Sequence, residues 1–143
     1  MKAEHRETID RPIEEVWAVF EDTEAMVEWQ GNLISYEQIS DGVSLQTVRN
    51  AGMNQELTVK LLDRKAPSLS KSRYEGAQVP FEITNTFKAV DQDSTEWCAE
   101  MDLKLNLLTK ALGPVLKPVM LELIKRNGRD FKSYVEEGAE RRS

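Results

Sequence analysis

Three side chains could act as an acid or a base in a reaction, namely His5, Glu7 and Tyr74. His5 and Glu7 share one face of an expected first strand at residues 3–9, because side chains two positions apart in a strand point the same way. The sequence contains no G-x-S-x-G, P-loop or Rossmann glycine pattern that would give them a mechanism. Because a strand end can also be wet by solvent, we assign no catalytic residue.

Metal and redox chemistry have little support in the residue counts. Cys98 is the lone cysteine and His5 the single histidine, so one chain can form neither an internal disulfide nor a metal site of cysteines or histidines. Cys98 is expected on an outer strand face beside Glu96 and Glu100, whose charges disfavour the reactive thiolate. We expect no metal, nucleotide or other cofactor.

The charge balance argues against nucleic acid as a partner. The formal net charge is −6, and an acidic protein repels phosphate backbones. The basic residues cluster only in the last third of the chain, where a solvated helix face is the expected reading. No run of eighteen apolar residues exists to span a membrane, and the polar N-terminus does not resemble a secretory signal. We therefore expect a cytoplasmic protein.

The last third of the chain is predicted to form a long helix. Its spacing predicts a short helical lead-in at 106–112 and a main helix at about 115–137, with Gly113, Pro114 and Pro118 interrupting its start. A single apolar stripe at helical spacing predicts one buried face. The stripe comprises Leu108, Leu112, Val115, Leu116, Val119, Met120, Leu123, Phe131, Tyr134 and Val135.

The rest of the chain reads as strands and two short helices. Pro12 and the acidic pair after it begin a helix with an apolar face through Phe20, and Asp22 offers the N-cap of a second helix ending near Trp29. Alternating runs separated by turn residues then predict strands joined as hairpins. These runs are 33–39, 43–50, 54–62, 69–75, 80–89 and 95–105.

The run from Ile9 to Trp17, I-D-R-P-I-E-E-V-W, followed by Phe20, Asp22 and Trp29, resembles the start of many bacterial members of the START-like (SRPBCC) superfamily. That superfamily includes polyketide cyclase/dehydrase-like proteins and carriers of lipids. The resemblance covers nearly the whole chain and implies an α+β helix-grip fold. In this fold a seven-stranded antiparallel sheet curls around a long C-terminal helix, with two short helices between strands one and two. We expect a single domain at 1–138 and a disordered tail at 139–143.

The fold implies an apolar cavity between the sheet and the long helix. Strand alternation nominates inward residues, and the helix and the second short helix add others, although each of them could equally belong to a closed core. The candidate ligand-binding residues are Trp29, Leu57, Val59, Tyr74, Phe81, Ile83, Asn85, Phe87, Trp97, Ala99, Met101, Leu116, Met120, Leu123 and Ile124. Gln55, Ser70 and Ser72 also fall on inward positions, unless the register is shifted by one residue.

These features predict a protein that binds a hydrophobic or amphipathic small molecule, such as a lipid, an isoprenoid or a polyketide. The alternatives are a cyclase or aromatase acting in the same cavity, and a protein-interaction module whose cavity is vestigial. A homodimer is also possible, because an unpaired edge strand can pair with a second copy.

Overall fold

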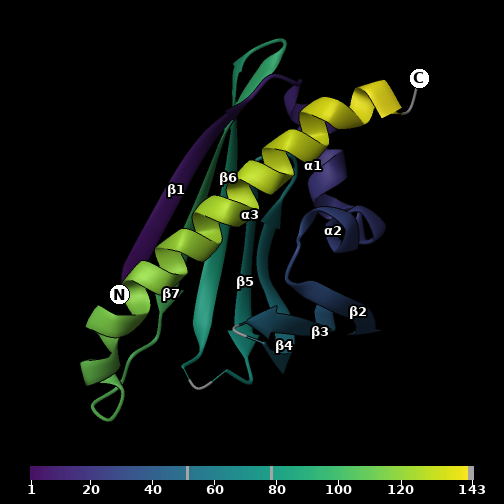
Figure 1. Ribbon diagram of the computed structural model, residues 1–143. Coiled ribbons are helices and arrows are strands. Elements are labelled where there is room, and N and C mark those ends of the chain that lie inside the picture. Colours follow the sequence, from purple (N-terminus) through teal and green to yellow (C-terminus); the bar gives the residue numbers. More distant parts are fainter. Residues whose placement is uncertain (51, 78, 142–143) are drawn as a thin grey trace.

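One antiparallel sheet and one long helix lying across it form most of the protein, as the computed structural model shows (Figure 1). The structure describes residues 1–50, 52–77 and 79–141. The strands are β1 (Lys2–Ile9), β2 (Leu33–Ser40), β3 (Val43–Asn50), β4 (Met53–Lys65), β5 (Leu69–Glu75), β6 (Phe81–Asp91) and β7 (Ser94–Leu103). The helices are α1 (Ile13–Glu21), α2 (Thr23–Trp29) and α3 (Gly113–Arg141), with a 3₁₀ turn, η1, at Lys110–Leu112.

The seven strands form a single sheet in the order β1-β7-β6-β5-β4-β3-β2. Strands β2 to β7 follow one another as hairpins, and β1 pairs with β7 along its whole length, from Lys2 opposite Asp102 to Ile9 opposite Thr95. All the pairs are antiparallel. The predicted helix-grip fold, with two short helices between β1 and β2 and a long C-terminal helix, is confirmed.

Helix α3 packs most closely on β1 and crosses the sheet diagonally (Figure 1). Met120, Ile124, Phe131 and Val135 are buried on its inner face. A Cβ atom at position 128 would lie 2.7 Å from Cδ2 of the His5 ring, so the helix and the strand approach this closely because residue 128 is a glycine. This contact fixes the height of α3 above the sheet.

The predicted single buried stripe of this helix is wrong at three positions. Leu108, Val115 and Val119 are exposed to solvent. At about 100° per residue, Val115 points roughly 140° away from Met120, which faces the sheet. Leu108 lies before the helix, in the loop that follows β7. The apolar pattern therefore covers two faces, and the sheet buries only one of them.

The two short helices begin where the sequence predicts. The carboxylate of Asp22 accepts hydrogen bonds from the backbone N–H groups of Glu24 (3.1 Å) and Ala25 (3.3 Å), and so caps α2. Phe20 of α1 packs edge-on against Phe87 of β6 and Phe131 of α3. This aromatic cluster joins the short helices, the sheet and α3 at one end of the core.

Helix α3 ends at Arg141, four residues beyond its predicted end at 137. Of the predicted disordered tail, residues 142 and 143 lie outside the described residues. The domain boundary at 138 stays a prediction.

Candidate functional site

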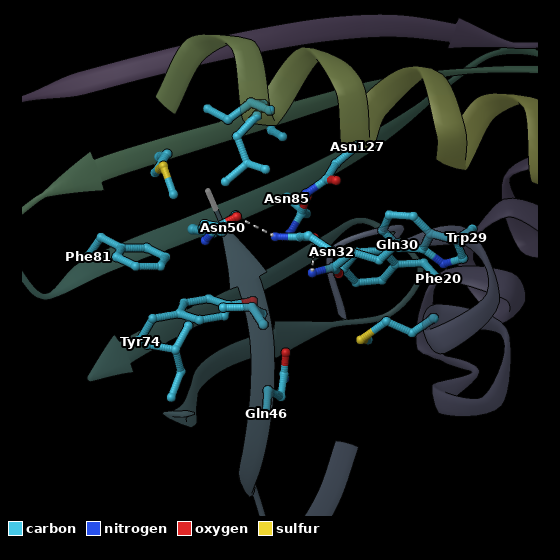
Figure 2. A pocket seen from close by; sticks show the side chains of 18 of the residues that line it. Phe20, Trp29, Gln30, Asn32, Gln46, Asn50, Tyr74, Phe81, Asn85 and Asn127 are labelled. Carbon is cyan, nitrogen blue, oxygen red and sulfur yellow. Dashed lines mark hydrogen bonds between the residues drawn. The ribbon is translucent and has the colours of Figure 1, made fainter. Parts of the chain in front are cut away.

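A cavity of about 140 Å³ lies between the concave face of the sheet, α2 and α3 (Figure 2). We call it the first cavity. Its apolar and aromatic lining consists of Phe20, Met26, Trp29, Val48, Leu57, Tyr74, Phe81, Ile83, Trp97, Ala99, Met101, Leu123 and Ile124. Six carboxamide side chains complete it, from Gln30, Asn32, Gln46, Asn50, Asn85 and Asn127. All of the described lining residues are uncharged at neutral pH.

Three of these carboxamides form a hydrogen-bonded row along one wall (Figure 2). The Nε2 of Gln30 donates to Oδ1 of Asn32 at 3.3 Å, and the Nδ2 of Asn32 donates to Oδ1 of Asn50 at 3.2 Å. The row joins the end of α2, the residue before β2 and the end of β3. Because each amide keeps further donor or acceptor capacity, the row can still hydrogen-bond a ligand.

Asn85 and Gln46 are also held in place by neighbouring side chains. The Oδ1 of Asn85 accepts a hydrogen bond from the indole N–H of Trp97 at 3.0 Å. The Nε2 of buried Gln46 donates to the hydroxyl of buried Ser44 at 3.2 Å. Each amide thus has one fixed partner, which orients its remaining polar atoms within the cavity lining.

Two aromatic side chains bring N–H or O–H donors to the first cavity. Tyr74 stacks on Phe81 with ring centres 4.8 Å apart, and burial raises the pKa of its phenol to about 12. The phenol therefore stays protonated at neutral pH and can donate a hydrogen bond. Trp29 is buried, and its indole N–H has no hydrogen-bond partner among the described residues. A buried donor without a partner is costly, so an acceptor from a ligand would stabilise it.

A second cavity of about 340 Å³ adjoins the first on the side of α1. Five residues line both cavities and divide them, namely Phe20, Met26, Gln46, Tyr74 and Asn85. The remaining lining is more polar and comprises Glu21, Thr23, Tyr36, Gln38, Asp41, Gly42, Val43, Ser44, Val59, Leu61, Arg64, Ser70 and Ser72.

An ion pair between α1 and β4 lies on the wall of the second cavity. The guanidinium of Arg64 donates to both carboxylate oxygens of Glu21, at 2.5 and 2.6 Å. Hydrogen bonding to Arg64 lowers the pKa of Glu21. The charged lining residues Glu21, Asp41 and Arg64 thus belong to the second cavity, where Arg64 pairs with Glu21.

Most of the candidate residues nominated from the sequence line one of these cavities, and Val59, Ser70 and Ser72 line the second. Three of the fifteen candidate ligand-binding residues do not. Phe87 is buried against Trp17 and Trp97, Met120 is buried in the core beneath α3, and Leu116 packs against that core. Alternation and helical spacing identify an inward face, but they do not tell which inward residues pack together.

The acid–base candidates His5 and Glu7 line neither cavity. They hydrogen-bond each other, with 2.8 Å between His5 Nε2 and Glu7 Oε1, on the face of β1 that α3 covers at Gly128. Gln55 lines neither cavity as well. Tyr74 is thus the one acid–base candidate from the sequence that the structure places at a cavity.

Eight lining residues of the first cavity were missed in the sequence, namely Phe20, Met26, Gln30, Asn32, Gln46, Val48, Asn50 and Asn127. A signal existed for some of them. Ser44, Gln46 and Val48 alternate on β3, and Asn127 follows Leu123 and Ile124 at helical spacing. Gln30 and Asn32 lie in a turn, where no periodicity marks an inward direction.

Metal binding and thiol chemistry find no support among the residues that the structure describes. No group of three or more His, Cys, Asp or Glu side chains is placed to hold a metal ion there. Burial raises the pKa of the Cys98 thiol, and the carboxylates of Glu4 and Glu100 add to this. The thiolate is disfavoured as expected, but burial is the main cause, and Glu4 acts beside Glu100 in place of the expected Glu96. None of the described helices is long and apolar enough to cross a membrane.

The family described as "Polyketide cyclase / dehydrase and lipid transport" matches residues 1–136. The chain belongs to this family. The START-like resemblance seen in the sequence is thereby confirmed. No curated protein matches the sequence.

Solved structures similar to this member of the polyketide cyclase/dehydrase and lipid transport family share its fold at low sequence identity. A START superfamily protein from Mycobacterium smegmatis is 14% identical, with a TM-score of 0.84 over 95% of this chain and 97% of that one. A conserved protein from Geobacillus kaustophilus is 16% identical, with a TM-score of 0.80 over 94% and 95%. An aromatase/cyclase from Streptomyces is 19% identical, with a TM-score of 0.75 over 99% and 94%. At these identities the likeness establishes the fold alone.

Proposed function

We propose that the protein binds one uncharged, largely apolar small molecule that carries carbonyl or hydroxyl groups, in the first cavity. A lipid alcohol, an isoprenoid or a polyketide has this chemistry. The observation that carries the proposal is the lining, which combines an apolar wall with six carboxamides, the Tyr74 phenol and the unpartnered Trp29 N–H. A few well-placed polar groups in an apolar pocket are typical of sites that orient a small ligand.

The lining favours a neutral ligand over an anion. Burying a carboxylate without a cation or several donors is strongly unfavourable, whereas amides pair with neutral carbonyl and hydroxyl groups. Arg64, the basic residue that lines the adjoining second cavity, is already paired with Glu21. Neutral ligands should therefore bind more tightly than fatty acid anions of the same length.

Native mass spectrometry of gently purified protein tests the proposal. We expect an adduct that disappears on denaturation. In titrations, a long-chain alcohol should raise the melting temperature more than the fatty acid anion of equal length. No adduct and no thermal shift with any probe would contradict ligand binding. A preference for the anion would contradict the neutral class.

A pair of variants on adjacent residues of α3 localises the binding. Asn127 lines the first cavity, whereas Arg126 is exposed on the outer surface. Asn127→Trp should fill the cavity and abolish the adduct, whereas Arg126→Trp should keep it. Loss of the adduct in both variants, or in neither, would place the ligand elsewhere.

A second candidate function is a cyclisation in the same cavity. Tyr74 and Asn85 both line the boundary of the two cavities, and a protonated phenol can stabilise the oxyanion that forms when a carbanion attacks a ketone. Incubation with a poly-β-ketone chain would test it. A ring-closed product with loss of water, formed more slowly by Tyr74→Phe, would favour the enzyme, whereas an unchanged chain would favour the carrier.

A further inference from the structure

Four exposed apolar side chains gather where the chain passes from β7 into α3. Leu107 and Leu108 keep 94% and 91% of their surface exposed, and Val115 and Val119 keep 69% and 65%. We call these four residues the apolar tip. The valines are one helical turn apart and exposed on α3. The leucines lie in the loop between β7 and η1, which precedes the first turns of α3 (Figure 1). Nothing in the described chain covers them.

The loop that carries the two leucines is held in a defined shape. The Oδ1 of Asn106 accepts hydrogen bonds from the backbone N–H groups of Leu108 (2.9 Å) and Thr109 (3.0 Å). The hydroxyl of Thr109 accepts one from the N–H of Asn106 at 2.9 Å. The fold therefore presents both leucines to water instead of letting them turn inward, and such apolar exposure points to a binding surface.

The segment between Asp102 and Glu122, which carries the apolar tip, is locally basic. Residues 103–121 contain Lys104, Lys110 and Lys117 and no acidic residue, in a chain whose formal net charge is −6. Lys104 is paired with Asp102 at 2.9 Å. Lys110 and Lys117 make no ion pair within the part of the chain that the structure describes. Lys117 points about 160° away from Val115 and Val119, on whose side of the helix Glu122 lies. Lys110, two residues after Leu108, is the free cation beside the leucines, and it fits a partner that is apolar and negatively charged.

We propose that the apolar tip docks on the surface of an anionic lipid bilayer. The leucines project from a turn and are almost completely exposed, so a protein partner would need a groove shaped to receive them. A bilayer deforms around any projecting apolar group, while the nearby Lys110 reaches the phosphate groups of the lipids. The protein lies on the membrane surface in this arrangement and does not span it.

The position of the tip relates it to the first cavity. The loop after β7 is bonded to the β5–β6 turn, because the N–H of Lys104 donates to the carbonyl oxygen of Pro80 at 2.9 Å. The next residue, Phe81, lines the first cavity. Docking would bring this end of the cavity towards the lipid. The membrane surface is nevertheless independent of the proposed ligand, and each can be tested without the other.

Co-sedimentation of the full chain with lipid vesicles tests the proposal. The probes are vesicles of phosphatidylcholine alone and of phosphatidylcholine mixed with phosphatidylglycerol. We expect binding to the mixed vesicles, weakened by added salt. Leu107→Ser combined with Leu108→Ser should lower the partition coefficient at least about tenfold, because the inserted apolar area is lost. Lys110→Gln should lower it by roughly fivefold on the anionic vesicles, whereas Lys117→Gln, on the opposite side of α3 from the two valines, should lower it less.

A matched control uses exposed apolar residues at the other end of the sheet. Leu62 lies near the end of β4, and Val90 lies beside the β6–β7 turn, so both are remote from the β5–β6 turn that adjoins the tip. Leu62→Ser combined with Val90→Ser should leave vesicle binding unchanged. Because all the substituted side chains are exposed, the variants should keep the melting temperature of the wild type.

Several results would overturn the proposal. The proposal is wrong if the wild-type protein binds neither kind of vesicle. It is also wrong if the variant with both leucines replaced binds as well as the wild type. Light scattering distinguishes a second copy as the occupant. If the protein binds no vesicles and is a dimer that becomes monomeric when Leu107 and Leu108 are replaced, the tip serves self-association.

Discussion

Asn85 serves both the core and the cavity, because its Oδ1 accepts the Trp97 indole N–H while its side chain lines the two cavities. Asn85→Leu leaves that N–H unpaired and should lower the free energy of unfolding by about 1–3 kcal/mol. Adding Trp97→Phe removes the N–H that has lost its partner. The double variant should therefore lose less free energy of unfolding than the two single variants lose together. Urea unfolding of all four proteins measures the coupling. Strict additivity would show that the hydrogen bond contributes nothing.

Because of Tyr74, the free energy of unfolding should depend on pH in the alkaline range. Its pKa is about 12 in the folded protein, where burial disfavours the phenolate, against about 10 in an unfolded chain. Below pH 10 both states hold the proton. Between pH 10 and 12 the unfolded state releases it first, so stability should fall by up to about 2–3 kcal/mol. Tyr74→Phe should remove this part of the loss in denaturation curves recorded at pH 9 to 12.

The direction of a single side chain was predictable where residues alternate between the two faces of a strand. Alternation placed Tyr74 and Asn85 inward from the sequence, and both line the cavities. Gln30, Asn32 and Asn50 were not predictable in this way, because they meet at the ends of three different elements. Their hydrogen-bonded row exists only once the sheet has curled, and no local pattern encodes that curl.

At the scale of elements, the contact between α3 and β1 depends on Gly128. Replacing glycine by alanine in a helix usually stabilises it by about 0.5–1 kcal/mol. At position 128 the new methyl would meet the His5 ring at 2.7 Å and approach Trp97. Gly128→Ala should therefore lower the free energy of unfolding, by about 1 kcal/mol or more. In a His5→Ala background the same substitution should become neutral or stabilising, as thermal or urea unfolding can show.

Gly138 provides the control on the same helix. A Cβ atom there meets nothing within 4 Å, so Gly138→Ala should not destabilise the protein. If Gly128→Ala proved as harmless as Gly138→Ala, the close approach of α3 to β1 would not be needed for stability.

Helix α3 also shows what periodicity can and cannot predict. The repeat of apolar residues predicted a long helix correctly, and capping by Asp22 predicted the start of α2. The outward direction of Val115 and Val119 was missed, because a wide apolar stripe was read as one face. A helix that meets two apolar environments and a helix with one broad buried face have similar patterns. The position of the sheet decides between them.

On the scale of the whole molecule, the curled sheet encloses two cavities with a divider of side chains. Met26 of α2 contributes to that divider and is partly buried, whereas its neighbour Val27 is exposed. The succession of β2 to β7 as hairpins followed from the turn residues, and the helix-grip fold followed from the resemblance to the START-like superfamily. The pairing of β1 with β7 was not predicted from the residues. The division of the interior did not follow, since it depends on contacts between Phe20, Met26 and residues from three strands.

If the first cavity binds apolar ligands, Met26 should limit their length. Met26→Ala should join the two cavities and admit longer chains, whereas Val27→Ala should not. In a series of linear alcohols, affinity should rise roughly fourfold per buried methylene until the cavity is full. The chain length at which this rise stops should increase in Met26→Ala and stay at the wild-type value in Val27→Ala. Calorimetric titration gives that limit for each protein. If this chain-length limit were unchanged in Met26→Ala, the ligand would not reach the second cavity. Other side chains besides Met26 would then separate the two cavities.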